Sequence, residues 1–313
     1  MPRRRALMAA LLTLAATVVA AVGAPPAAQA AITCDTASSN ATTWYDGPSA
    51  GYTYDPPFYP SHYLTWTHTH TPQGAATWSN WDGSGTALIL VTSYRDGAEA
   101  YIQAINASTG ANLPGLRIAE FHAGGIAVVG SWVYISAGTT IRRYRTADLR
   151  TALQNGGGYV ASAGSQTVTA ASFLGTYGGA VFAGEFDPDV RGWMYQYTVN
   201  SDGSLTRVGS GWEVPTKTQG VIVTGSHFLF STSYGRQNRS NIYSVRRGYT
   251  GSLDNASLYC FRAPSMSEGM TQWNGSAYVV YESGSHLYSP DPTTRNVIRN
   301  MHRVSMSFLT SLV

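Results

Sequence analysis

The chain is 313 residues long, and 43% of its residues are hydrophobic while only 12% are charged. Its 33 glycines, 20 tyrosines and 8 tryptophans are typical of β-structure with glycine turns and aromatic packing, which excludes a mainly helical or a disordered chain. The formal charge of +3 equals the contribution of Arg3, Arg4 and Arg5. The rest of the chain is therefore neutral, and we expect no nucleic-acid partner.

Residues 1–30 have the pattern of a secretory signal peptide. The three arginines precede an apolar stretch at 6–22, and Ala28-Gln29-Ala30 supplies a small-residue cleavage pattern. The apolar stretch is short for a membrane span, so a retained anchor is the less favoured alternative. We expect a secreted, extracellular protein with no membrane partner.

Two cysteines remain after the signal, Cys34 and Cys260. Secretion places them in an oxidising environment, which predicts a disulfide between them. No short C-x-x-C spacing is present, so cysteine-bound metal is not expected. Cys34 lies in residues 31–69, which precede the first repeat and which we interpret as a closing segment.

Residues 70–313 contain five copies of one pattern. In the clearest copies a Gln-Gly or Glu-Gly pair is followed by a glycine-centred turn and an apolar strand, as after Gln219-Gly220 and Glu268-Gly269. The intervals between successive copies are 51, 48, 47 and 49 residues. The copies begin at Gln73, Gly124, Ser172, Gln219 and Glu268. A fixed period of this size, with short strands in each unit, predicts a β-propeller.

Each copy predicts the same succession of strands. An apolar second strand such as 228–231 is followed by an alternating third strand such as 101–105, and 257–262 is the clearest fourth strand. Residues 147–154 predict a short peripheral helix. We therefore expect an all-β fold with five blades, and six or seven blades as the alternative.

The last copy ends before a fourth strand. The closing segment is the available donor, and a strand from it would leave no open sheet edge. A Cys34–Cys260 bridge would then lock this segment to the outer strand of the fourth blade.

The start of each first strand and the end of each second strand lie at the same end of a propeller, because the two strands are antiparallel neighbours. Polar residues from both sets are therefore expected around one channel mouth, the usual ligand site of a concave fold. The ligand-binding residues predicted on this basis are His70, Gln73, Tyr94, Arg95, Ser172, Gln219 and Arg236. The alternative is that these residues cap strands and bind channel water.

Glu268 is the one carboxylate among the first residues of the five copies. Burial would raise its pKa and suit it to general acid catalysis, and we name it with His122 and Tyr234 as candidate catalytic residues. A neutral histidine beside a tyrosine would suit removal of a sugar-ring proton. A water-filled channel carboxylate without a catalytic role is the alternative.

Metal chemistry has weaker support. His68 and His70 form an H-x-H pair that a strand would point to one face, and His122 would be a third ligand. Packing histidines are commoner than metal ligands, so we expect no metal, and the absence of cofactor-binding motifs predicts no cofactor.

Two copies end their second strands alike, with Tyr94-Arg95 in the first and Tyr234-Gly235-Arg236 in the fourth. A tyrosine ring can stack on a sugar face and an arginine can bind a carboxylate, although packing after duplication explains the match equally well. The loop from Trp78 to Asp82 is a further candidate for sugar stacking, and the alternative is that its tryptophans fill gaps between blades.

This repeat architecture resembles secreted five-bladed propellers, both the glycosidases of the arabinanase and levansucrase group and the tachylectin-type lectins. The glycosidase resemblance implies three acidic residues around the mouth, where this chain has Glu268, with Glu185 or Glu282 as a second carboxylate. The lectin resemblance implies near-identical pockets on all blades, whereas the five copies here differ.

Three functions follow from these observations. The first is recognition of an extracellular glycan or polysaccharide at the channel mouth. The second is a carbohydrate-active hydrolase or lyase that uses Glu268 with histidine or tyrosine. The third is binding of an extracellular protein, such as a secreted protease, through an exposed apolar patch.

Overall fold

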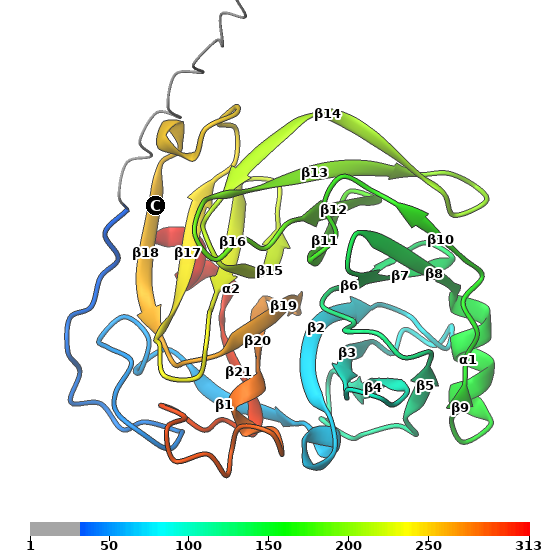
Figure 1. The fold of residues 1–313 in the computed structure, drawn as a ribbon, viewed down its shortest axis with the longest axis horizontal. Helices are drawn as coiled ribbons and strands as arrows, with labels where there is room; N and C mark the ends of the chain where they lie inside the picture. The colour runs from blue at the N-terminus through cyan, green and yellow to red at the C-terminus, as the bar shows by residue number, and fades with distance from the viewer. Residues whose placement is uncertain (1–31) are drawn as a thin grey trace, which may run out of the picture. The chain divides into compact units, whose positions relative to one another are not determined.

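The computed structural model describes residues 32–313, so the expected signal peptide at 1–30 lies outside the described residues. These residues form five small sheets arranged in a ring (Figure 1), the five-bladed all-β propeller that the repeats predict. The innermost strands of neighbouring blades contact one another all the way round the ring.

Three blades contain strands in simple chain order. Blade two consists of β6 (Ile126–Val129), β7 (Trp132–Ala137), β8 (Thr140–Arg145) and β10 (Gly164–Thr167). Blade three consists of β11 (Phe173–Tyr177), β12 (Ala180–Gly184), β13 (Gly192–Val199) and β14 (Leu205–Val214). Blade four consists of β15 (Thr218–Val223), β16 (His227–Thr232), β17 (Ser240–Arg246) and β18 (Leu258–Ala263).

Blades one and five each borrow a strand from elsewhere in the chain. Blade one consists of β2 (Thr71–Trp78), β3 (Leu88–Tyr94), β4 (Ala100–Asn106), β5 (Leu116–Ile118) and the parallel strand β9 (Gly158–Tyr159). Blade five consists of β19 (Ser267–Trp273), β20 (Ser276–Tyr281), β21 (Asn300–Ser305) and β1 (Tyr59–Tyr63).

The helices are short and lie outside the blades or in their connections. They are α1 (Thr146–Gln154), α2 (Met306–Ser311) and the 3-10 helices η1 (Thr65–His68), η2 (Leu253–Asn255) and η3 (Glu282–Gly284). Helix α1 confirms the helix expected near 147–154. Among residues 32–313, no helix is long and apolar enough to span a bilayer.

The hydrophobic core lies between adjacent blades. In β3, Leu88 and Leu90 pack toward blade two, while Ile89 and Val91 pack toward blade five. Successive residues of a strand point to opposite faces, so each sheet contributes to two interfaces at once. Because both faces of each sheet are covered, the second strands are continuous apolar runs instead of alternating ones.

The glycine of the repeated pair allows the inner strands to approach closely. A Cβ built on Gly269 would lie 2.5 Å from the backbone nitrogen of Ala75, and one on Gly74 would lie 2.8 Å from the Cα of Gly125. A Cβ on Gly220 would lie 2.9 Å from the Cα of Gly269. Real Cβ atoms do not approach backbone this closely, so the repeated glycine is required by packing around the channel.

Ring closure follows the sequence prediction. Strand β1 pairs antiparallel with β21, with Tyr59 opposite Arg303, and so completes blade five. The Cys34–Cys260 disulfide is present, and Asp35 forms a parallel bridge with Phe261 on the outer edge of β18. The closing segment is therefore fixed to blade four and to blade five.

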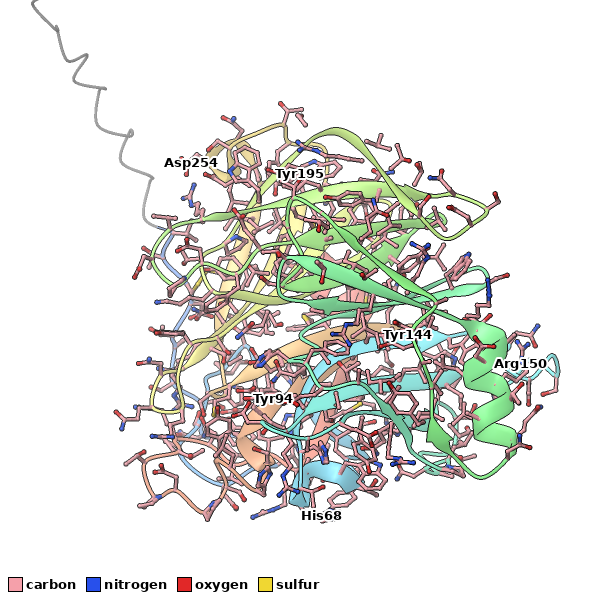
Figure 2. The ribbon with its side chains drawn as sticks, turned by 45° about the vertical axis from the view of Figure 1, so that its right-hand side comes forward. His68, Tyr94, Tyr144, Arg150, Tyr195 and Asp254 are labelled. Atoms are coloured by element: carbon pink, nitrogen blue, oxygen red, sulfur yellow. A yellow bond between two sulfur atoms is a disulfide. The ribbon has the colours of Figure 1, made fainter. Side chains whose placement is uncertain are left out.

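The tryptophan loop differs from the expectation of an exposed stacking surface. Trp78 is 4% exposed and packs in the interface between blades one and two. Arg150 of α1, labelled in Figure 2, holds its guanidinium carbon 5.6 Å from the Trp78 ring. Burial between blades removes the Trp78 face from any sugar, so a stacking role for this residue is wrong.

Candidate functional site at the channel mouth

A cavity of about 630 Å³ opens at one mouth of the central channel. Its wall combines residues of the inner strands with residues of the loops that follow the second strands. The residues that line it are Gln73, Tyr94, His122, Phe186, Gln219, Ser233, Tyr234, Gly235, Arg236, Gln237, Asn238, Met266, Glu268, Glu282 and Tyr288. The cavity therefore lies where the repeat pattern predicts convergent polar groups.

Two carboxyl groups from blade five face this cavity. Glu268 is on β19 and is 2% exposed, and Glu282 begins η3, directly after β20, and is partly exposed. Ser233 donates a hydrogen bond to Glu268 Oε1 at 3.2 Å. Gln73 Nε2 donates to Glu282 Oε1 and also to the carbonyl oxygen of Pro72 at 2.9 Å.

Burial makes ionisation of this pair unfavourable. Loss of hydration raises the pKa of Glu268 well above its ordinary value, and the negative charge of Glu282 raises it further. Burial also raises the pKa of Glu282, and the hydrogen bond from Gln73 opposes that rise. Burial therefore favours the protonated form of both carboxyl groups, more strongly for Glu268 than for Glu282, whose pKa is raised to about 7.

Aromatic side chains form the wall beside the carboxyl pair. The Tyr94 and His122 rings have centroids 4.1 Å apart, and Tyr288 lines the same wall. Burial, with the charge of Glu282, raises the pKa of Tyr94, which keeps its hydroxyl protonated. Dehydration of the His122 ring lowers its pKa, so the imidazole is neutral near pH 7.

The opposite rim is the loop that follows β16. Tyr234 is 52% exposed; its ring centroid lies 6.0 Å from that of Phe186, and Lys217 Nζ lies 5.9 Å from it. Arg236 forms a 3.1 Å ion pair with Asp291, which ties this loop to the loop that carries Tyr288. Tyr234 is thus a half-exposed aromatic side chain at the rim of the cavity.

Unusual backbone conformations cluster at the same mouth. Ala123, Lys217 and Met266 have φ values of 53°, 65° and 63°, in the left-handed region that non-glycine residues rarely adopt. They lie one or two residues before Gly124, Gln219 and Glu268, respectively. Such conformations are often retained at functional sites, because the surrounding structure must support their cost.

A second cavity of about 320 Å³ adjoins the first. The two share Gln73, His122, Phe186 and Gln219, and the second extends to Ser172 and Ser136 of blades three and two. The mouth is therefore an elongated depression with the carboxyl pair toward one end.

Most of the predicted site residues are brought together. Seven of them line the first cavity, namely Gln73, Tyr94, His122, Gln219, Tyr234, Arg236 and Glu268. Ser172 lines the adjoining cavity. Tyr94, labelled in Figure 2, is the last residue of β3.

Two predicted ligand-binding residues, His70 and Arg95, line neither of these cavities. His70 is buried, with Nε2 3.1 Å from the carbonyl oxygen of Glu99 and its ring against Tyr101. Arg95 is exposed. Helix η1 precedes His70 and turns the chain just before β2 begins, so a position near a strand start did not suffice to place this side chain at the mouth.

The alternative of a three-histidine metal site has no geometric support. His68 Nδ1 contacts the carbonyl oxygen of Thr65, His70 faces Glu99, and His122 packs on Tyr94. Within residues 32–313, no three His, Cys, Asp or Glu side chains are grouped as metal ligands would be.

The second carboxylate is Glu282, one of the two that the sequence offered. Glu185, the other, accepts a hydrogen bond from the Trp193 backbone nitrogen at 2.9 Å and does not line the mouth. Phe186 and Tyr288 were not predicted, because they lie in irregular loops between the repeated strands. Their only sequence signal is proximity to the ends of second strands.

Comparison with known proteins adds little to this geometry. No family model and no curated protein matches the chain. A solved structure from Bacteroides fragilis, described as a candidate 6-phosphogluconolactonase, has 15% sequence identity, and the match covers 65% of this chain and 63% of that one with a TM-score of 0.37. The match thus spans less than two thirds of that structure, and a likeness at this level carries no argument about the site.

Proposed function

We propose that this protein is exported and recognises an extracellular glycan or polysaccharide at its channel mouth. The observation that carries the proposal is a cavity of about 630 Å³ lined by amide, hydroxyl and aromatic side chains around the buried carboxyl group of Glu268. Amides and hydroxyls match the donors and acceptors of a polyhydroxyl ligand, and aromatic faces match its apolar ring surface. The Cys34–Cys260 disulfide is consistent with an extracellular location.

A second candidate function is hydrolysis of a glycosidic bond, and the second carboxyl group favours it. In this reaction Glu268 gives its proton to the glycosidic oxygen, and the C–O bond breaks with its electron pair on that oxygen. Water adds to the anomeric carbon and gives a proton to the Glu282 carboxylate. Transfer of that proton from Glu282 to Glu268 restores the pair.

His122 and Tyr234 serve this chemistry differently from the carboxyl pair. The neutral imidazole of His122 can accept a proton, which would suit the lyase form of the reaction. Tyr234 is at the open rim, where its ring suits sugar stacking better than proton transfer. Glu268 is therefore the residue that recognition, hydrolysis and the lyase reaction have in common, and a product assay distinguishes these three functions.

A product assay tests the proposal. The exported protein and its Glu268→Gln variant are incubated with plant and microbial polysaccharides, and soluble products are read by mass spectrometry while retention is measured on the same polysaccharides immobilised. Products from the wild type that disappear with Glu268→Gln support hydrolysis or elimination. Retention without products supports recognition alone.

Absence of both products and retention would contradict the carbohydrate proposal and direct attention to a protein partner. The Gln272→Glu variant is the matched control, because it adds a carboxyl group near the opposite end of the channel. It is expected to behave as the wild type.

A further inference from the structure

The channel mouth contains two cavities that adjoin each other. They share four residues, and Phe186 is among them, so the aromatic ring stands at their junction. The volumes of about 630 and about 320 Å³ are both in the range of small-ligand sites. A compact ligand would fill one cavity and leave the other to water.

The second cavity has a different chemical character from the first. Beyond the shared residues it is lined by Gly124, Ser136, Gly138, Ala171 and Ser172. Its only ionisable lining residue is His122, which belongs to both cavities. The carboxyl pair is therefore confined to the first cavity, and the second offers a small, neutral surface.

We propose that the mouth binds two consecutive sugar units of an oligosaccharide or polysaccharide, one over Glu268 and Glu282 and the next between His122 and Ser172. This inference rests on the proposed glycan recognition and specifies its ligand as a chain instead of a free monosaccharide. Phe186 lies at the junction, where a ring face can contact the apolar side of either sugar.

Unused hydrogen-bonding groups support the second position. Neither Ser172 Oγ nor the Gln219 side-chain amide forms a hydrogen bond with any other side chain or backbone group of residues 32–313. Ser136 Oγ, in contrast, already contacts the backbone of Gly125. Ser172 and Gln219 are thus available for sugar hydroxyl groups, whereas Ser136 is committed to the fold.

Blade two contributes no side chain to the second cavity from the first residue of its copy. Where the other copies begin with glutamine, serine or glutamate, blade two has Gly124. A Cβ at Gly124 would lie 2.7 Å from the Ser172 carbonyl oxygen and 3.5 Å from Ser136 Oγ. The glycine therefore permits close packing of blades two and three and leaves no side chain to fill the second cavity.

Calorimetric titration with matched sugars of one, two and three units tests this inference. The probes are the arabinose, xylose and glucose series, each added to the exported protein. In the series that binds, the disaccharide is expected to bind at least about tenfold more tightly than the monosaccharide, and the trisaccharide to add little. Ser172→Leu, which fills the second cavity, is expected to reduce disaccharide affinity to that of the monosaccharide.

The matched control is Thr176→Leu, four residues further along the same blade and lining the opposite channel end. It is expected to leave every affinity unchanged. Ser172→Ala removes the hydroxyl without adding bulk, so it keeps the test decisive if Ser172→Leu does not fold, and a several-fold loss is expected for the disaccharide alone.

Two results would overturn the inference, and they have different meanings. Equal affinities for one and two units in the wild type would refute the second sugar position while glycan recognition stood. No binding at any length, from any series, would refute the inference and glycan recognition together.

Discussion

The two ends of the central channel are lined by the same five inner strands, and yet their chemistry differs. At the mouth, the first residues of these strands meet loops that carry Glu282, Tyr288 and Tyr234 around a cavity of about 630 Å³. At the opposite end, a cavity of about 260 Å³ is lined by strand residues such as Ala75, Val221 and Thr271, without an acidic or basic side chain. Titratable groups are thus concentrated at one end.

The two residues of the repeated pair have different roles, since the second allows the inner strands to pack closely and the first lines the mouth. The second residue of the pattern is glycine in four copies, where adjacent backbones approach too closely for a side chain. The first residue faces the mouth and varies among glutamine, glycine, serine and glutamate. Packing therefore requires the glycine at the second position of the pair, whereas the side chain at the first position can differ between blades and line the site.

The largest effect is expected on catalytic activity, from a substitution at the mouth compared with one at the opposite end of the channel. With hydrolysis as the reaction, Glu268→Gln is expected to lower turnover by about 100-fold to 10,000-fold, because a positioned general acid contributes that much. Initial rates of product formation on the polysaccharide that the wild type cleaves provide the measurement. Gln272→Glu at the opposite end is expected to stay within about twofold; a similar loss in both variants would remove the distinction between the ends.

A second prediction concerns the packing half of the repeated pair. Gly269→Ala is expected to lower the free energy of unfolding by about 1–3 kcal/mol, because its Cβ would meet the backbone of Ala75 and Gln73 at 2.5 and 2.7 Å. Urea unfolding measures the change. Gln272→Ala, in the exposed part of the same strand, is the control and is expected to stay within about 0.5 kcal/mol. Equal effects would mean that the close approach is readily relieved.

A third prediction follows from the raised pKa of Glu268. A carboxyl group whose pKa is higher in the folded than in the unfolded protein stabilises the fold at low pH, and this contribution is lost as pH rises through the folded pKa. Glu268→Gln, which cannot ionise, is therefore expected to gain stability relative to the wild type between pH 4 and pH 8. The gain at pH 8 is about 1.4 kcal/mol for each pH unit that lies above the unfolded pKa and below both the folded pKa and pH 8.

Urea unfolding at both pH values measures this gain. The control is Glu99→Gln, whose exposed carboxylate pairs with Arg117 at 3.0 Å. Its effect is expected to stay within about 0.5 kcal/mol at either pH, as for other surface pairs. A Glu268→Gln effect that did not change with pH would show that Glu268 is ionised in the fold at no cost.

Much of the fold could be predicted because each prediction depended on a repeated local pattern. Five copies of the pattern predicted five blades, the absence of a fourth strand after the one expected at 300–306 predicted closure by residues 31–69, and Cys34 had only Cys260 as a partner. Burial of both sheet faces was less evident, although continuous apolar runs in the second strands are its signature.

The site was predicted only where it belongs to the repeat. Glu268, Gln219 and Gln73 occupy equivalent positions, so one rule placed all three at the mouth. Tyr288 and Phe186 come from loops of irregular length, whose path depends on tertiary contacts such as the Arg236–Asp291 ion pair. A linear pattern carries no information about those contacts.

Carbon-13 NMR of glutamate carboxyl groups, titrated from pH 3 to pH 9, is the measurement to make first, because it requires no ligand. We expect one carboxyl resonance to remain in its protonated position at pH 7 and to disappear in Glu268→Gln, and a second, from Glu282, to titrate at about pH 7. If all glutamate resonances instead reach their ionised positions by about pH 5, neither carboxyl group at the mouth holds a proton to donate at neutral pH, and the raised pKa of Glu268 is refuted.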